Sequence, residues 1–180
     1  YTYSFSMNKA IKIGRLMHYF YHPRVVYLDE DEMTKYARYT KQLLQMYNES
    51  TGSFSDPDQA QQLLMLRKNI LHKARNKMNA FVDIIREIGE DKLKYCFVYS
   101  ASGKRYDQAK DENEQYDLEI LKQMLAITKQ IFPSVRCNSY TSNDSKELRK
   151  QKLDAFAEGK IDVLFAKNCL DEGVDVPRAE

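Results

Sequence analysis

Apolar residues recur along this chain with two different periods, and the period changes near residue 89. Before that point they return every three or four residues, over 33–47 and again over about 59–88. This spacing is typical of amphipathic helices. A polar stretch over 48–58, rich in turn-forming residues, separates the two runs. The pattern predicts two long helices that form a helical hairpin over residues 31–88.

After Gly89 the chain alternates between short apolar runs and helical stripes. The expected order is strand, helix, strand, helix, strand, over residues 95–99, 118–131, 135–140, 144–159 and 161–165. Such an order favours a parallel sheet whose connections are right-handed and whose helices cover both faces. The predicted fold class is therefore α/β, with residues 89–180 forming the core and the helical hairpin inserted before it.

The first 30 residues combine aromatic, small and basic side chains. Ala10-Ile11 and Ile13 before Gly14 predict a short helix that the glycine ends. The β-branched run Arg24-Val-Val-Tyr-Leu28 predicts a first strand, and the acidic residues 29–32 that follow mark the start of a helix.

Composition narrows the function classes only slightly. Apolar residues make up 43% of the chain, and 28 Lys and Arg stand against 26 Asp and Glu, so the net charge does not by itself indicate a polyanionic partner. Any contact with nucleic acid is expected to be local. The three cysteines, Cys96, Cys137 and Cys169, are far apart in apolar runs and are expected to be reduced.

No run approaches the roughly 18 apolar residues of a membrane span, and no charged-then-apolar leader opens the chain, so a cytoplasmic location is expected. The chain starts without Met and stops at Glu180 directly after a conspicuous turn. We therefore expect it to be a piece of a longer protein.

Polar segments follow each predicted strand of the sheet. They are Ser100–Gly103, Thr141–Asn143 and Lys167–Asp175. In an open parallel sheet the ligand site lies beyond the carboxyl ends of the strands. These three segments are accordingly the expected site.

Familiar catalytic and phosphate-binding motifs are absent. The sequence has no GxxxxGK[ST], no GxGxxG after a strand and no HExxH. His18, His22 and His72 all lie outside the predicted site, and no metal ligand is assigned.

The run Ile161-Asp-Val-Leu-Phe-Ala-Lys-Asn-Cys-Leu-Asp-Glu-Gly-Val-Asp-Val-Pro177 resembles motif V of the superfamily 2 (DEAD/DEAH-type) helicases, in the wording of restriction-enzyme motor subunits and repair helicases. Lys94–Ser100 is similar to the strand of motif IV, and Leu148–Phe156 with Gly159 is similar to the helix before motif V. Tyr3-Ser4, Ala10-Ile11 and Gly14–Leu16 are similar to the segment that joins the two lobes of these motors. The resemblance implies the second RecA-like lobe of such a motor.

Several residue roles follow from this resemblance. Gly173, Asp175 and Glu172 fall on the ATP side of the cleft between the lobes, and Lys167 and Asn168 fall on the nucleic-acid side. Independently of the family, Gly173 permits a close backbone approach, and Asp175 offers an acceptor for a ribose hydroxyl.

Hydroxyl groups at the strand ends add to the nucleic-acid side. Ser100, Ser102, Thr141 and Ser142 are candidates for hydrogen bonds to backbone phosphates, although hydroxyls also cap strands and helices. Many relatives carry threonine where this chain has Lys167. In this chain an ammonium contact would therefore take the place of the hydroxyl contact.

The second helical run carries basic residues, among them Arg67 and Arg75. A solvated charged face explains them, and so does a ridge that grips a duplex. Charge reversal at these two arginines, with binding measured against salt, separates the two interpretations.

The resemblance also implies what the whole protein needs. ATP and Mg²⁺ would bind with an amino-terminal lobe of the same chain, and the arginine finger of motif VI would follow residue 180. The expected partner is nucleic acid, with DNA favoured over RNA, and the piece alone is expected to hydrolyse nothing. Two alternatives stay open: an ATP-independent nucleic-acid-binding or interaction module, and a small-molecule enzyme that uses Cys169.

Overall fold

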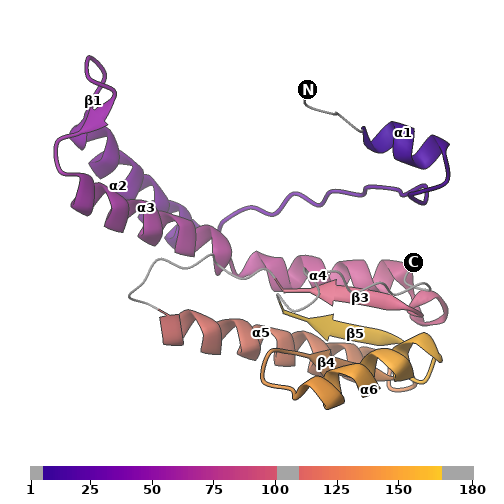
Figure 1. The fold of residues 1–180 in the computed structure, drawn as a ribbon. Coiled ribbons are helices and arrows are strands. Elements are labelled where there is room, and N and C mark those ends of the chain that lie inside the picture. The colour runs from indigo at the N-terminus through magenta and orange to yellow at the C-terminus, as the bar shows by residue number, and fades with distance from the viewer. Residues whose placement is uncertain (1–5, 101–109, 168–180) are drawn as a thin grey trace.

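The computed structural model describes residues 6–100 and 110–167, with side chains from residue 118 onward in the second range. Figure 1 shows a small sheet surrounded by helices and a helical hairpin that projects to one side. The helices are α1 (Met7–Lys12), α2 (Glu30–Met46), α3 (Pro57–His72), α4 (Asn76–Ile88), α5 (Lys110–Ile131) and α6 (Lys146–Ala157), with a 3-10 turn at Glu90–Lys92. The strands are β1 (Tyr47–Asn48), β2 (Ser53–Phe54), β3 (Cys96–Tyr99), β4 (Cys137–Tyr140) and β5 (Val163–Ala166).

The main sheet has three parallel strands in the order β3-β5-β4. The last strand in the chain is therefore the central one. All four of its residues are buried, whereas β3 and β4 lie at the edges of the described sheet and are only partly buried. The parallel α/β core predicted from the alternating pattern is confirmed.

Alternate residues of β5 point to two separate cores. Val163 and Phe165 pack with Phe81 and Ile85 of α4 and Leu121 of α5. On the opposite face Leu164 and Ala166 pack with Phe156 of α6. Helices therefore cover both faces of the sheet, as predicted, because each strand presents apolar side chains in both directions.

The end of α6 requires a glycine. Gly159 has φ +71°, and a Cβ placed there would lie 2.9 Å from the hydroxyl oxygen of Tyr95. The turn returns the chain to the sheet, because the amides of Lys160 and Ile161 both donate to the carbonyl of Ala155. Gly159 thus allows the chain to pass closely under the start of β3.

The helical hairpin consists of α2 and α3, joined through the short antiparallel pair β1–β2. Its small core contains Leu43, Ala60 and Leu63. Asp29 caps α2 in a capping box with Glu32, and Asp56 with Pro57 opens α3. The hairpin is held by its own core and projects away from the sheet (Figure 1).

The prediction of one continuous helix over 59–88 is wrong, because residues 73–75 interrupt it and separate α3 from α4. Ala74 is buried at the break, and the amide of Arg75 donates to the Glu32 side chain at 3.0 Å instead of to its own helix. As a result α4 leaves the hairpin and packs on the sheet. The hairpin spans α2 and α3 only.

The strand predicted over 24–28 is also wrong. These residues are extended but pair with no strand in the described part of the chain. Val25 and Tyr27 are 77% and 75% exposed, so their high β propensity finds no neighbouring strand to pack against. The short helix α1 and its end near Gly14 agree with the sequence. Across the described residues, no helix is both long and apolar enough to cross a membrane.

Candidate nucleic-acid interface

Three of the predicted site residues lie side by side at one edge of the sheet. Tyr99, Ala166 and Tyr140 form a single row across β3, β5 and β4. Ser100, Lys167 and Thr141 are the next residues of the three strands. Their backbones are linked as well: the Ser100 amide donates to the Ala166 carbonyl at 3.1 Å, and the Lys167 amide donates to the Tyr140 carbonyl at 3.3 Å.

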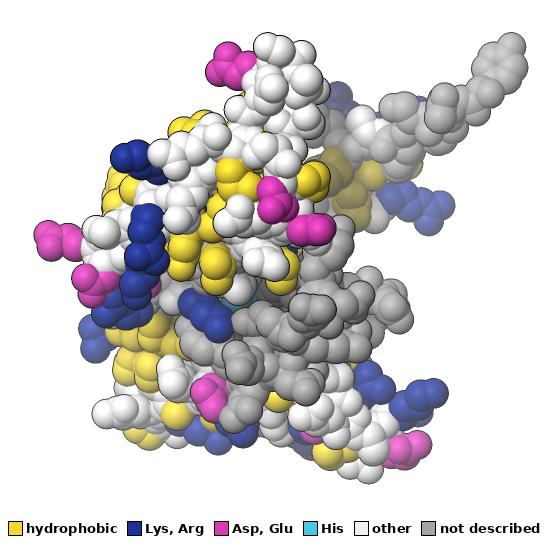
Figure 2. All heavy atoms as spheres, turned by 90° about the vertical axis from the view of Figure 1, so that its left-hand side faces the viewer, with side chains coloured by type: hydrophobic (Ala, Val, Ile, Leu, Met, Phe, Trp, Pro, Cys, Tyr) yellow, Lys and Arg dark blue, Asp and Glu magenta, His cyan; other side chains and the backbone are white. Residues whose placement is uncertain are grey.

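Burial distinguishes these residues from their neighbour Ser142. Ser100, Thr141 and Lys167 are each less than a tenth exposed, whereas Ser142 is exposed. The three backbone amides of this row already donate within the protein, so its candidate contacts with a ligand are made by side chains. Figure 2 views the molecule from the side toward which the strands point, and on that face Lys and Arg side chains lie among apolar ones together with Asp and Glu.

The loop after β4 is fixed by the carboxylate of Asp144. Ser145 caps α6, because its hydroxyl accepts from the Leu148 amide. Asp144 instead accepts from the Thr141 amide at 3.0 Å and pairs with Lys152 at 2.8 Å. The backbone of Asp144 closes the same loop, because its amide donates to the Thr141 carbonyl.

Lys152 determines the charge beside this edge. Burial raises the pKa of Asp144, but the hydrogen bonds from Lys152 and from the Thr141 amide outweigh it and bring the pKa below its usual value. The carboxylate stays ionised, and Lys152 neutralises it. Without Lys152 a bare negative charge would lie next to the row where a phosphate is expected. Neither residue was identified from the sequence, because the pairing joins a loop to a helix turn.

The opposite edge of the sheet carries a different arrangement. Asp162, which precedes β5, accepts two bonds from the Arg136 guanidinium, at 2.7 and 2.9 Å, and one from the Arg136 amide at 2.9 Å. Hydrogen bonding from Arg136 lowers the pKa of Asp162, although burial opposes the shift. This pair joins the amino ends of β4 and β5.

Six other predicted site residues are not part of this row. Ser102, Asn168, Glu172, Gly173 and Asp175 lie outside the described residues. Their assignments to the nucleic-acid side and to ATP stay predictions. Ser142 is described, but it lies on the surface beside the buried row. Among the described residues no three His, Cys, Asp or Glu side chains gather as a metal site requires.

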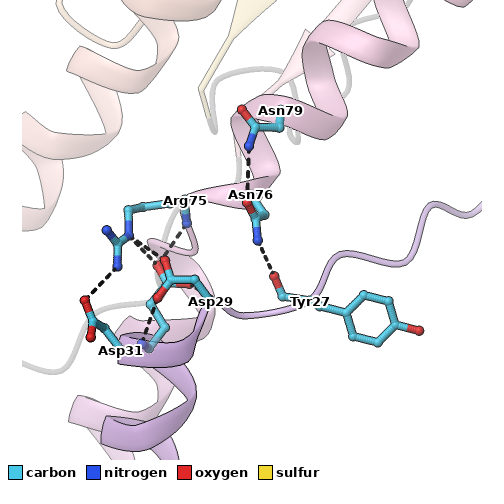
Figure 3. Close-up of polar contacts among 7 residues, drawn as sticks. Tyr27, Asp29, Asp31, Arg75, Asn76 and Asn79 are labelled. Atoms are coloured by element: carbon cyan, nitrogen blue, oxygen red, sulfur yellow. Dashed lines mark hydrogen bonds and ion pairs between the residues drawn. The ribbon is translucent and has the colours of Figure 1, made fainter.

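The two hairpin arginines are engaged within the protein. The Arg67 guanidinium donates to the Tyr36 hydroxyl at 2.8 Å and lies 4.7 Å from the centre of its ring. Arg75 reaches Asp29 at 2.7 Å and Asp31 at 3.6 Å, as Figure 3 shows. Arg67 thus joins α3 to α2, and Arg75 joins the break before α4 to the start of α2.

A parallel sheet with helices on both faces places these hydroxyl and lysine side chains at its carboxyl edge, where open α/β folds bind their ligands. Comparison with protein families defines the group. Residues 61–180 match the helicase conserved C-terminal domain, and the chain belongs to that family. The match includes α4, the sheet and the expected site, and it excludes α1, the extended segment and α2.

One solved structure is similar in sequence and shape. It is the helicase domain of Hef from Pyrococcus furiosus, with 21% identity and a TM-score of 0.40 over 81% of this chain. The chain covers 28% of the length of that protein. No curated protein matches this chain.

Proposed function

We propose that this chain is the second lobe of an ATP-dependent motor that moves along nucleic acid, and that the carboxyl edge of its sheet contacts the backbone of one strand. The observation that supports this most is the row of Ser100, Lys167 and Thr141, one from each strand and aligned by the sheet register. Hydroxyl and ammonium groups are the side chains that bind phosphates without reading sequence. The amino-acid sequence of the motif V segment favours a DNA motor of the restriction or repair type.

ATP would bind between this lobe and a first lobe of the same protein. Glu172, Gly173 and Asp175 are proposed for the ATP side, and the first lobe would supply the residues that hold Mg²⁺. Closure of the two lobes on ATP would shift the strand held at the row, and hydrolysis would release it. In a protein that carries both lobes, Asp175→Ala should therefore lower the ATPase rate that nucleic acid stimulates.

The two lysines at the ends of β5 supply a matched test. Lys167 directly follows the strand and lies at the proposed interface, whereas Lys160 precedes it and lies at the opposite edge. Binding of a fluorescent DNA strand is measured by anisotropy at several salt concentrations for Lys167→Gln and Lys160→Gln. Loss of one phosphate contact should reduce the slope of log K against log salt by about 1 and weaken all sequences similarly.

The control should retain the slope of the unmodified chain. Equal slopes for both variants would remove Lys167 from the interface and contradict the proposal. A Thr141→Val and Ser142→Ala double variant extends the test to the hydroxyls, with weaker binding expected at unchanged salt slope, because no charge is lost.

A further inference from the structure

The extended segment before α2 carries a concentration of exposed aromatic side chains that the motor row does not explain. We define the arm as residues 13–28. Its most exposed side chains are Phe20 at 82%, Tyr21 at 80%, Met17 at 78%, Val25 at 77% and Tyr27 at 75%. Aromatic side chains are usually largely buried, so a run of this kind indicates a surface that binds something.

The charge of this region identifies the kind of partner. Residues 1–28 contain four basic residues, Lys9, Lys12, Arg15 and Arg24, and no Asp or Glu. The other 152 residues hold 24 Lys and Arg against 26 Asp and Glu. The whole positive excess of the chain therefore lies in residues 1–28, and the arm holds two of these four basic residues, Arg15 and Arg24. A segment with net positive charge and no acidic residue of its own fits a polyanion rather than a basic or neutral protein face.

Two contacts attach the carboxyl-terminal part of the arm to α4. Asn76 donates to the Tyr27 carbonyl at 2.9 Å, and Arg24 pairs with Glu87 of α4. Figure 3 shows the first of these contacts beside the Arg75 cluster. Figure 1 shows the arm running from α1 toward α2 above α4. These contacts fix residues 24–28, so the aromatic group at residues 18–22 is displayed from an anchored base.

The extended backbone presents the aromatics in two directions. In an extended chain successive side chains alternate, so His18 and Phe20 share one side and Tyr19 and Tyr21 the other. The His18 and Phe20 rings lie 5.6 Å apart, which confirms that they neighbour each other. Basic residues beside exposed flat rings are the combination that binds single-stranded nucleic acid, with rings stacking on bases and cations contacting phosphates.

We propose that the arm binds single-stranded nucleic acid by stacking unpaired bases on Phe20 and Tyr21, with Arg15 contacting the backbone. The arm lies outside the residues that match the helicase family, so this contact is additional to the row at the sheet edge. Stacking requires unpaired bases, and the arm should therefore favour single strands over duplex.

The test uses the whole 180-residue chain and two fluorescent probes of equal length, an oligo-dT strand and an abasic strand that keeps the phosphates. The unmodified chain should bind oligo-dT more tightly than the abasic strand, by about 5- to 150-fold for each ring that stacks. The Phe20→Ala and Tyr21→Ala double variant should lose that difference. Leu64→Ala, which removes an exposed apolar side chain from α3, should retain it.

Charge is tested separately. Arg15→Glu should weaken both probes, whereas Lys41→Glu, an exposed lysine on α2, should have a smaller effect on both. Equal binding of the two probes by the unmodified chain would overturn the proposal, as would an unchanged difference in the double variant. A double variant that changes only the oligomeric state would assign the arm to protein contact and would also overturn it. Lys167→Gln tests phosphate contacts at the carboxyl edge of the sheet. Its result is therefore independent of the result for the arm.

Discussion

Arg75 Nε lies 2.7 Å from Asp29 Oδ2, and this pair joins the break between α3 and α4 to the cap of α2. The Asp29 carboxylate already accepts from the Glu32 amide, and its pKa is lowered chiefly by that hydrogen bond and further by Arg75. The same Glu32 receives the Arg75 amide at 3.0 Å. One cluster therefore sets where the hairpin leaves the core (Figure 3).

Loss of the Arg75 side chain should loosen the base of the hairpin without unfolding the core. Arg75→Gln removes the contacts to Asp29 and Asp31 but leaves the packing of α4 on the sheet intact. Amide hydrogen exchange should become faster in the first turn of α2 and stay unchanged in β5. Lys68→Gln, on the exposed face of α3, is the control, and equal exchange in both variants would remove Arg75 from this role.

The core depends on Phe156, which is fully buried against the sheet and contacts Tyr95 and Phe97. Phe156→Ala leaves a cavity and should lower the free energy of unfolding by about 3–5 kcal/mol, measured by urea denaturation. Leu44→Ala removes a side chain that is 68% exposed and should change stability by less than about 0.5 kcal/mol. Similar losses in the two variants would contradict the packing described.

Stability should depend on Asp162 in acid. Its pKa is lowered below the ordinary value of 3.8, chiefly by the hydrogen bond from Arg136. A lowered native pKa means that the pair stabilises fully above 3.8 and loses its effect as pH falls through the native pKa. Asp162→Asn should cost about 1–3 kcal/mol near neutral pH, toward the lower end because Arg136 is more than half exposed.

This pH dependence has a clear contrary result. The stability difference between Asp162→Asn and the unmodified chain, measured by urea denaturation, should shrink as the pH falls below about 4. A difference that stays constant down to strongly acidic pH would show that the carboxylate is not ionised in the native pair.

Cys137 should be unreactive in the folded chain. Burial raises the pKa of its thiol to about 11, so little thiolate is present at pH 8. Mass spectrometry after iodoacetamide treatment at that pH should show Cys137 unmodified in the native chain and modified after unfolding. Rapid alkylation under native conditions would mean that the face of β4 beside α5 is open to solvent.

The sequence predicted the α/β core well because each of its elements has a strong local signal. The continuous apolar run of β5 and the acidic start of α2 at residues 29–32 need no distant partner to be identified. The errors fall where a distant contact decides the outcome. The helix break at Arg75 depends on Glu32, 43 residues away, and residues 24–28 lack the neighbouring strand that their composition suits.

The site was predicted in part for the same reason. Parallel topology alone brings Ser100, Thr141 and Lys167 to one edge, so the strand ends were sufficient to predict that these residues lie together, while their roles stay predictions. Asp144 and Lys152 were missed because their pairing links a loop to the second turn of α6. The arm was missed because its aromatics resemble core residues until their exposure is known.

The central claim concerns which edge of the sheet meets the strand, and titration of the isotope-labelled chain with an oligo-dT strand, followed by NMR, tests it directly. We predict that the amide signals of Ser100, Thr141, Ser142 and Lys167 shift on binding, while those of Arg136 and Asp162 at the opposite edge stay in place. Shifts at the Arg136 edge with none at the carboxyl ends of β3, β4 and β5 would contradict the account.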